Sequence, residues 1–359
     1  MSQVRTVSWD PEGPSIRIID QRLLPNELRI RALGSLEEVE EAIRSMAVRG
    51  APAIGAAAAF GLALAGLRSP AQRPSDLLAH LEEAGAFLKA ARPTATNLSW
   101  AVSRLLGAAR SSLDGGAQSV RLRVLEEAQK LADEDVEINR RIGRHGAALL
   151  HDGDTVVHHC NTGALATVDY GTALGVIRAA HEEGKRIHVL VDETRPRLQG
   201  ARLTAWELDR LGISHEIIVD GAAGYFLRTG RVAAALVGAD RVASNGDLAN
   251  KVGTYMLALA AFDNHVPFYC AVPASTVDLG LASGDEIPIE ERDPAEVLDV
   301  IQQGKPAAPS GATARNPAFD VTPARLVSAF ITEAGLLTPP YGPALARAVR
   351  EASRPWTSS

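Results

Sequence analysis

Four side chains with acid–base or nucleophilic chemistry follow short apolar segments in the second half of the sequence. Cys160 ends TVVHHC, and the aspartates Asp192, Asp220 and Asp240 end RIHVLVD, HEIIVD and AALVGAD. These segments are rich in β-branched residues and alternate with helical patterns, which predicts parallel strands. Because ligands bind beyond the carboxyl ends of such strands, we expect one thiol and three carboxylates along one edge of a sheet.

Cys160 carries the most nucleophilic group of this set. It leads into the small residues 161–164, which we expect to open a long helix. The amides at a helix N-terminus attract anions and lower the pKa of a nearby thiol. The alternative is a small apolar residue in a core strand, which is the role we expect for Cys270 in PFYCAVP.

The histidines before Cys160 raise the question of a metal site. Successive strand residues face opposite sides, so we expect His158 to share a side with Cys160 and His159 to face away. Two ligands without a third at ligand spacing make a poor zinc site. The sequence also lacks GxGxxG and GxxxxGK[ST], which argues against dinucleotide and P-loop binding.

Positively charged residues stand in front of two expected helices. Asn250 and Lys251 come shortly after Asp240 and begin the apolar pattern KVGTYMLALAAF, where a helix N-terminus and an ammonium group can hold a phosphate. Residues 49–52, Arg-Gly-Ala-Pro, precede another apolar helix in the same way. The alternative in both places is a solvated surface charge.

The elements that must position these groups fall into two regions. Short β-type runs near residues 6 and 15 precede helical spacing from about residue 36 to residue 150, and strands then alternate with helices. We therefore expect an α/β protein with an N-terminal, mostly helical domain carrying a few short strands, and a C-terminal, doubly wound, Rossmann-like parallel sheet. The expected domains are 1–130 and 131–355, and the expected strands are 155–160, 186–192, 215–220, 234–240 and 267–273, with a surface loop near residue 302.

Composition narrows the class of protein further. The 359 residues include 37 basic and 43 acidic ones, a net charge of −6 without long runs of one sign, so a nucleic-acid-binding face is not expected. Two cysteines build no disulfide framework, and the N-terminus has no apolar signal core. The apolar run 53–67 is shorter than the roughly 20 residues of a membrane span. We expect a cytoplasmic protein with no membrane segment and a buried helix at 53–67.

Several segments together resemble the 5-methylthioribose-1-phosphate isomerases of methionine salvage, which share an ancestor with the regulatory subunits of the exchange factor for translation initiation factor 2. The resemblance runs from SIRIIDQRLLP to YGPAL, nearly the whole chain. The matching segments are MAVRGAPAIGAAAAFG (46–61), RPTATNLSWAV (92–102), HCNTGALATVDYGTALGVI (159–177), DETRPRLQGARLTAWEL (192–208) and VGADRVASNGDLANKVGTY (237–255).

The resemblance implies an aldose–ketose isomerase that converts 5-methylthio-α-D-ribose 1-phosphate to 5-methylthio-D-ribulose 1-phosphate. It implies a homodimer, formed through the C-terminal domain, without nucleotide, metal or organic cofactor. Asp240 is then the proton donor and Cys160 the transition-state stabiliser or base. The implied substrate contacts are Arg49, Gly50, Ala51, Arg92, Gln199, Asn250 and Lys251.

Three other functions stay open at this stage. A ribose-1,5-bisphosphate isomerase needs a second phosphate site, and the Ala-rich, aromatic-poor N-terminal region favours an apolar C5 substituent instead. A 5-deoxyribose-1-phosphate isomerase differs only by a missing thiomethyl group. A non-catalytic regulatory subunit needs neither Cys160 nor Asp240, and retention of both favours an enzyme.

Overall fold

The computed structural model describes residues 5–93 and 95–352, and it divides into two compact units. Unit 1 extends to Arg140 and also includes Thr162–Gly171, whereas unit 2 comprises Arg141–Asn161 and the chain from Thr172 onward. This division lies ten residues beyond the expected boundary at 130/131, and no sequence pattern indicated the inserted segment 162–171. The outermost residues of the expected domains, 1–4 and 353–355, lie outside the described residues.

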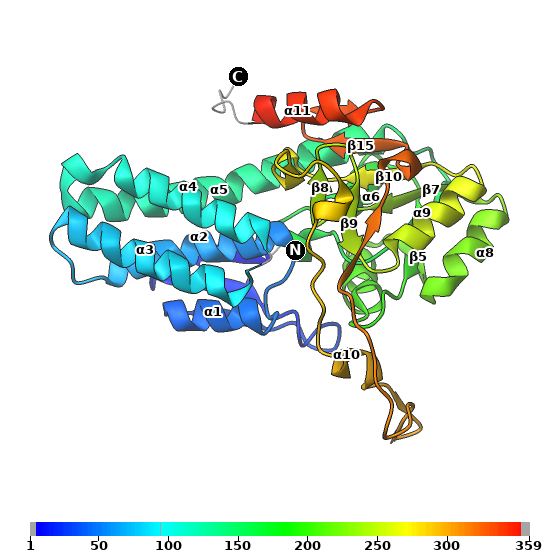
Figure 1. The fold of residues 1–359 in the computed structure, drawn as a ribbon, viewed down its shortest axis with the longest axis horizontal. Coiled ribbons are helices and arrows are strands. Elements are labelled where there is room, and N and C mark those ends of the chain that lie inside the picture. The colour runs from blue at the N-terminus through cyan, green and yellow to red at the C-terminus, as the bar shows by residue number, and fades with distance from the viewer. Residues whose placement is uncertain (1–4, 94, 353–359) are drawn as a thin grey trace. The chain divides into compact units, whose positions relative to one another are not determined.

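Unit 1 is a helical domain with one small antiparallel sheet, as expected (Figure 1). The sheet order is β1-β2-β3, and hydrophobic side chains from these strands and the helices form one core. The elements are β1 (Val7–Asp10), β2 (Ser15–Ile19), β3 (Ile30–Leu33), α1 (Leu36–Arg44), α2 (Ala51–Arg68), α3 (Pro74–Ala91), α4 (Thr96–Arg110) and α5 (Gly116–Ala147), whose last residues belong to unit 2.

Helix α2 lies at the centre of that core. By length and composition this 18-residue helix could cross a membrane, but 78% of it is buried inside the protein. Small residues allow this close packing; a side chain at Gly61, for example, would press against Val39 of α1. The expectation of a buried helix at 53–67 is confirmed.

Unit 2 contains a seven-stranded sheet in the order β16-β15-β10-β7-β4-β5-β6. All neighbouring strands are parallel except the pair β15 and β16. The five strands expected from the sequence are present, and the α/β fold class is confirmed. The strands are β4 (Thr155–His158), β5 (His188–Asp192), β6 (Ser214–Ile218), β7 (Val232–Val237), β10 (Phe268–Ala271), β15 (Ala329–Thr332) and β16 (Gly335–Leu337), and the helices are α6 (Ala173–Glu182), α7 (Ala205–Leu211), α8 (Ala223–Arg228), α9 (Thr254–Asp263) and α11 (Tyr341–Ala352).

The strand order reverses between β4 and β7. From β4 the chain proceeds outward to β5 and β6, and it then returns to add β7 on the opposite side of β4. Such a reversal separates the loops that leave the two neighbouring strands and opens a crevice beyond their carboxyl ends. The ends of β4 and β7 are therefore the place where a ligand site is expected.

A second, four-stranded sheet in the order β11-β8-β9-β14 follows directly after β7. It contains β8 (Arg241–Ala243), β9 (Leu248–Lys251), β11 (Val277–Asp278) and β14 (Phe319–Thr322). The expectation that Asn250 and Lys251 begin a helix is wrong, because both belong to β9 and α9 begins only at Thr254.

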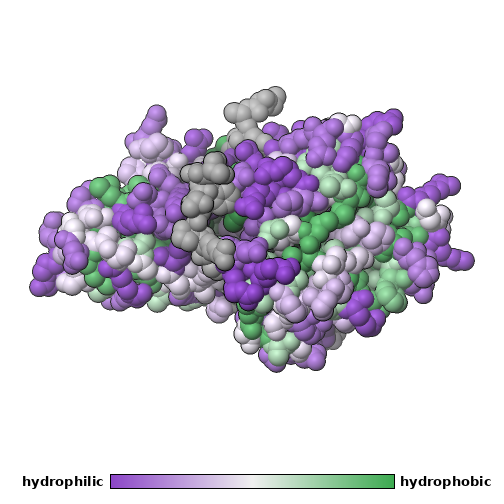
Figure 2. Space-filling view, turned by 90° about the horizontal axis from the view of Figure 1, so that it is seen from above, coloured by the Kyte–Doolittle hydropathy of each residue, from purple (hydrophilic) through white to green (hydrophobic). Residues whose placement is uncertain are grey.

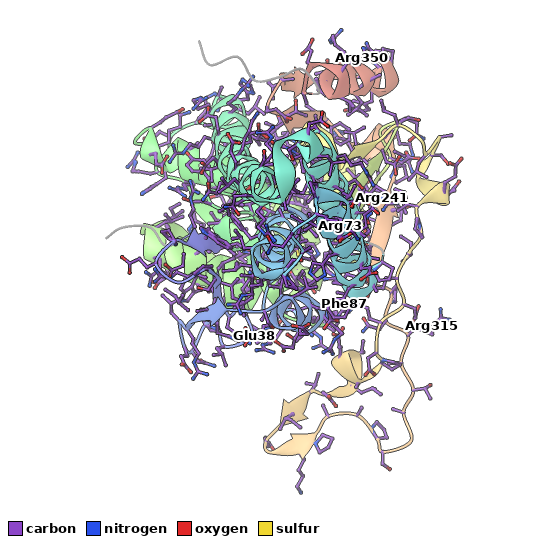
Figure 3. The ribbon with its side chains drawn as sticks, turned by 90° about the vertical axis from the view of Figure 1, so that its left-hand side faces the viewer. Glu38, Arg73, Phe87, Arg241, Arg315 and Arg350 are labelled. Carbon is purple, nitrogen blue, oxygen red and sulfur yellow. The ribbon has the colours of Figure 1, made fainter. Side chains whose placement is uncertain are left out.

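A long segment between β11 and β14 extends away from the sheet. Figure 3 shows it as an open loop that carries Arg315. It contains α10 (Ala295–Leu298) and a hairpin of β12 (Ile301–Gln302) and β13 (Lys305–Pro306), so the surface loop expected near residue 302 is ordered around a two-stranded tip. We call residues 290–317 the arm.

Candidate active site

Cys160 lies two residues beyond β4, where hydrogen bonds hold both its backbone N–H and its carbonyl group. Its φ of 69° is in the left-handed region, and its side chain is 7% exposed. The backbone N–H donates to Thr194 Oγ1 at 2.9 Å, and the carbonyl oxygen accepts from Thr204 Oγ1 at 2.7 Å. These bonds fix the direction in which the thiol leaves the strand end.

The helix expected directly after Cys160 does not form. Ala164–Ala166 make a single 3₁₀ turn, and α6 begins only at Ala173. The prediction that an N-terminal helix dipole acts on the thiol is therefore wrong. The intervening residues Thr162–Gly171 belong to unit 1, where the Thr6 side chain donates to the Ala164 carbonyl at 2.7 Å.

The loop after β5 is strained where it meets Cys160. Thr194, a β-branched residue, has a φ of 63°, and its Oγ1 donates to the Asp192 carbonyl. The Asp220 carboxylate accepts the backbone N–H groups of Thr194 and Arg195 at 2.7 and 2.8 Å. Asp220, one of the carboxylates expected at this edge, thus holds the strained loop in place.

Gln199 ends the same loop in an unusual environment. It precedes a π-helical turn, Gly200–Thr204, which continues into α7; such turns occur often at functional sites. A side chain at Gly200 would overlap the Asp192 carbonyl oxygen, so only glycine fits there. Gln199 is 7% exposed, and its Oε1 has no hydrogen-bond partner among the described residues. A buried acceptor in this state is ready for a ligand donor.

Asp240 lies where the main sheet of unit 2 meets the second sheet. It follows β7 by three residues, is partly buried, and donates its backbone N–H to the Ala249 carbonyl of β9 at 2.9 Å. On the same strand, Asn250 Nδ2 donates to Thr254 Oγ1 at 3.0 Å. Lys251 Nζ donates to the Ala318 carbonyl at 2.7 Å, and its side chain is 8% exposed. The hairpin of β8 and β9 therefore carries three of the expected site residues.

Cys160 and Asp240 follow adjacent strands. His158 at the end of β4 is paired with Leu236 of β7, and the two candidate catalytic residues come two and four positions later in the chain. They leave the sheet at the reversal of strand order. Parallel topology thus gives a thiol and a carboxyl group a common edge without any sequence proximity.

Asp192 pairs with the histidine that the sequence analysis placed on the opposite side. His159 Nδ1 lies 2.8 Å from Asp192 Oδ2, and its Nε2 lies 3.0 Å from the Val252 carbonyl oxygen. The expected alternation fails because the strand ends at His158 and the chain turns at Cys160.

Donor atoms of His159, Asp192 and Asp220 lie within 4.8 Å of one another, a spacing compatible with a cation. Both ring nitrogens of His159 and both oxygens of Asp220 already have partners in the protein. His159 and Asp220 are therefore engaged in hydrogen bonds, whereas Asp192 Oδ1 has no hydrogen-bond partner among the described residues.

In unit 1, Arg49, Gly50 and Ala51 form the entry to α2. Arg49 Nε donates to Gln21 Oε1 at 3.0 Å, and Gln21 Nε2 donates to the Leu165 carbonyl at 2.7 Å. Gly50 has a φ of 93°, and a side chain there would overlap the backbone of residue 166. No side chain caps the helix within the described residues. An arginine and the positive end of an 18-residue helix therefore lie next to each other.

Arg92 is the C-terminal cap of α3, and its carbonyl oxygen accepts from the Ala95 backbone at 3.0 Å. It belongs to unit 1 with Arg49, whereas Cys160 and Asp240 belong to unit 2. Residue 94 of the matching segment 92–102 lies outside the described residues. The candidate site residues therefore form two groups, one in each unit.

Sequence reasoning missed Thr194 and the role of His159. A threonine inside DETRPRLQG gives no signal of a left-handed backbone, because φ depends on the surrounding bonds. The adjacent His159 and Cys160 did indicate a possible site. The prediction assumed that their side chains alternate as in a strand, whereas both residues lie beyond the end of β4.

Comparisons with known proteins show which family the chain is similar to. The profile of the Initiation factor 2 subunit family matches residues 47–339. A methylthioribose-1-phosphate isomerase of Synechococcus is 54% identical over 96% of this chain and 98% of its own length. The crystal structure of 5-methylthioribose 1-phosphate isomerase from Pyrococcus horikoshii has a TM-score of 0.90 at 44% identity, covering 98% of this chain and 97% of that one. A structure described as translation initiation factor eIF-2B, subunit delta, from A. fulgidus has a TM-score of 0.86 at 42% identity, covering 97% and 100%.

Proposed function

This chain belongs to the initiation factor 2 subunit family, and from that premise we propose how its residues carry out one reaction. The protein is an aldose–ketose isomerase of methionine salvage, which converts 5-methylthio-α-D-ribose 1-phosphate to 5-methylthio-D-ribulose 1-phosphate. The observation that carries the residue assignment is the position of Cys160 and Asp240 after adjacent strands at the reversal of strand order.

Binding of the substrate requires groups for one phosphate and several hydroxyls. We assign the phosphate to Arg49 with the N-terminus of α2 at Gly50 and Ala51, and to Arg92, all of which belong to unit 1. Lys251 of unit 2 is assigned as a further substrate contact. Fixed cations and helix amides are the usual protein ligands of phosphate. Gln199 and Asn250 then hydrogen-bond the sugar hydroxyls, and the unpartnered Gln199 Oε1 supports the first of these roles.

The reaction begins with opening of the sugar ring. The anomeric oxygen carries the phosphate, so a free aldehyde cannot form, and the ring oxygen must be protonated as its bond to C1 breaks. Protonated Asp240 donates this proton, and its carboxylate then takes the proton of the O2 hydroxyl. The hydrogen on C2 moves to C1 with its electron pair, which leaves a ketone at C2, the phosphate on C1 and Asp240 protonated again.

Cys160 stabilises the charge that develops at C1 and C2 during this transfer. Its buried position supports that role, because a buried site excludes water from the reacting carbons. In the competing scheme Cys160 is a base that removes the C2 proton to give an enolate. The two schemes differ in the fate of that hydrogen.

A direct assay tests the proposed function. The purified protein is incubated separately with 5-methylthioribose 1-phosphate, 5-deoxyribose 1-phosphate and ribose 1,5-bisphosphate, and ketose formation is followed by NMR. We expect turnover of the first, with the highest kcat/KM of the three. A preference for the bisphosphate would assign a different isomerase, and no turnover of any of the three would favour a regulatory subunit.

We further propose that the protein is a cytoplasmic homodimer. Three large side chains of the adjacent helices α8 and α9 are exposed, namely Tyr225 (69%), Met256 (68%) and Phe262 (58%). Figure 2 shows apolar surface on unit 2 among hydrophilic side chains. Exposed apolar clusters of this kind favour contact with a second copy.

Light scattering after gel filtration measures the state of assembly. We expect a dimer for the wild-type protein and a monomer for Met256→Glu/Phe262→Glu, with Leu122→Glu in unit 1 as a matched exposed control. Leu122 is 55% exposed, so the control introduces one such carboxylate at similar exposure. A wild-type monomer, or a dimer that survives the double change, would refute this interface.

A further inference from the structure

His159 is buried next to Cys160 but has no step in the proposed mechanism. Its ring contacts Asp192 on β5 and the Val252 carbonyl in the turn between β9 and α9. It therefore connects three segments that are far apart in the sequence. Both partners present oxygen atoms to the ring.

These contacts determine the protonation of the ring. A backbone carbonyl can only accept, so Nε2 must carry a hydrogen, and Nδ1 faces a carboxylate. Burial lowers the pKa of His159, but the hydrogen bond and charge of Asp192 outweigh it and raise the pKa above the usual 6.5. The ring is therefore easier to protonate than an exposed histidine.

The charges around the ring favour the protonated form. Asp192, Asp220 and Asp320 all attract a positive charge at His159. His158 repels it only if protonated, and burial first, then the His159 charge, lower the pKa of His158 to about 3. His158 is therefore neutral and does not oppose protonation of His159.

The turn after Lys251 is shaped around this ring. Gly253 has a φ of 105°, and a Cβ there would lie 2.8 Å from His159 Cε1, so only glycine lets the turn approach. On the other side, Asp320 of β14 accepts the N–H groups of Gly253 and Tyr255 at 2.8 and 3.1 Å. The turn is thus held between β14 and the ring.

We propose that His159 is a positioning residue: its Nε2–H clamps the turn after β9 and so holds Asn250 and Lys251 in place beside the Cys160 loop. The inference rests on the functions proposed above for Cys160, Asn250 and Lys251. It predicts that loss of the bond to Val252 weakens substrate binding more than the chemical step.

Two variants separate the halves of the clamp. In His159→Asn the amide nitrogen takes the place of Nδ1, so contact with Asp192 is kept and contact with Val252 is lost. In His159→Gln/Asp192→Asn the longer amide reaches the Val252 carbonyl, and no carboxylate is left buried without a counter-charge. His158→Asn, the same change at an equally buried neighbour, is the control.

We expect His159→Asn to raise KM about tenfold with kcat within about threefold, and the double variant to return KM to within about threefold of wild type. An equal rise of KM in both variants, or a loss confined to kcat, would overturn the clamp. A comparable KM rise in His158→Asn would also overturn it, since the effect would then be general loss of packing.

Nitrogen-15 NMR of histidine-labelled protein tests the hydrogen on Nε2 without any variant having to fold well. We expect Nε2 of His159 to carry its hydrogen across about pH 6 to 8, because it faces a carbonyl oxygen that can only accept. An Nε2 without a hydrogen would refute the inference. Because this readout needs no substrate, it stays decisive if the proposed isomerase assay fails, and unchanged kinetics in His159→Asn with a protonated Nε2 in the wild type would refute the clamp and leave the proposed isomerase function standing.

Discussion

Asp240 is attached to the second sheet through its backbone, since its N–H donates to Ala249. Replacing its carboxyl group by an amide therefore leaves this attachment in place and removes the acid. Asp240→Asn is expected to lower kcat by at least about a hundredfold, the usual loss for a general acid, with KM within about threefold. Steady-state kinetics measures both, with the exposed Asp285→Asn as a control. Near wild-type turnover would remove Asp240 from the mechanism.

Isotope transfer distinguishes the two roles of Cys160. If hydrogen moves directly from C2 to C1, substrate deuterated at C2 gives product that retains deuterium at C1 in ordinary water. The enclosed position of Cys160, 7% exposed, favours retention because direct transfer of the hydrogen with its electron pair needs a site that excludes water. Mass spectrometry of product at low conversion measures the label.

The same role for Cys160 predicts that Cys160→Ser lowers kcat by loss of stabilisation while the product of the remaining activity keeps its label. Extensive washout from wild-type product would instead make Cys160 a base. Washout in wild type that disappears in the serine variant would identify the thiol as the group that exchanges.

At the scale of elements, the Glu296 carboxylate is one anchor of the arm, beside the bond from Arg195 to the Val297 carbonyl. Glu296 on α10 bonds Arg197 at 2.8 Å, in the loop that carries Gln199, and Asn316 Nδ2 at 3.1 Å. Burial raises the pKa of Glu296, but its bonds to Arg292 and Arg197 outweigh this and hold the pKa at about 2. The anchor is therefore complete above the usual value of 4.5 and is lost as the pH falls toward 2.

Hydrogen exchange along the arm checks this anchor. We expect Glu296→Gln to speed exchange of residues 295–317 at neutral pH. Asp299→Asn, an exposed carboxylate on the same arm, is expected to change little. Unaltered exchange in Glu296→Gln would show that the arm is held by its packing.

Elements with clear periodicity were predictable, and those set by long-range pairing were not. The strand ending at Asp192 and the helix after Gly50 follow from apolar runs and a proline-marked start. Strand β9 was missed because its polar residues Asn250 and Lys251 form a strand only by pairing with β8 and β14. The reversal of strand order likewise depends on which strands pair.

The candidate site was likewise predictable only in part. Residue types after strands predicted Cys160 and Asp240 at one edge of the sheet together with Asp192 and Asp220, because the carboxyl ends of parallel strands share an edge. The adjacency of the strands before Cys160 and Asp240 did not follow from the sequence. The hydrogen bonds of His159 could not be predicted, since they depend on a turn whose approach is set by Gly253. The positive φ of Thr194 is likewise a product of the bonds around it.

At the scale of the whole molecule, stability depends on a carboxyl group of the long helix α5. Asp135 accepts the Val168 N–H at 2.8 Å, and burial raises its pKa from 3.8 to about 7. The folded protein therefore holds a proton that the unfolded chain releases, and its stability falls as the pH rises from about 4 to 7.

Thermal unfolding at two pH values tests this dependence. Asp135→Asn keeps an acceptor for Val168 without the ionisation, so we expect a higher Tm than wild type at about pH 8 and an equal Tm at about pH 4. The exposed neighbour Asp133→Asn serves as a control. An equal difference at both pH values would attribute the effect to packing.

The return of Thr162–Gly171 to unit 1 has a consequence for how the protein is made. Unit 1 needs this segment, because the Thr6 N–H donates to the Val168 carbonyl at 3.0 Å and Gln21 bonds the Leu165 carbonyl. A ribosome that has released only the first 140 residues has therefore not yet supplied all of unit 1. Strand β4 of unit 2 emerges before the missing piece does. The N-terminal unit cannot finish folding ahead of the rest, and the nascent chain must begin both units before it completes either.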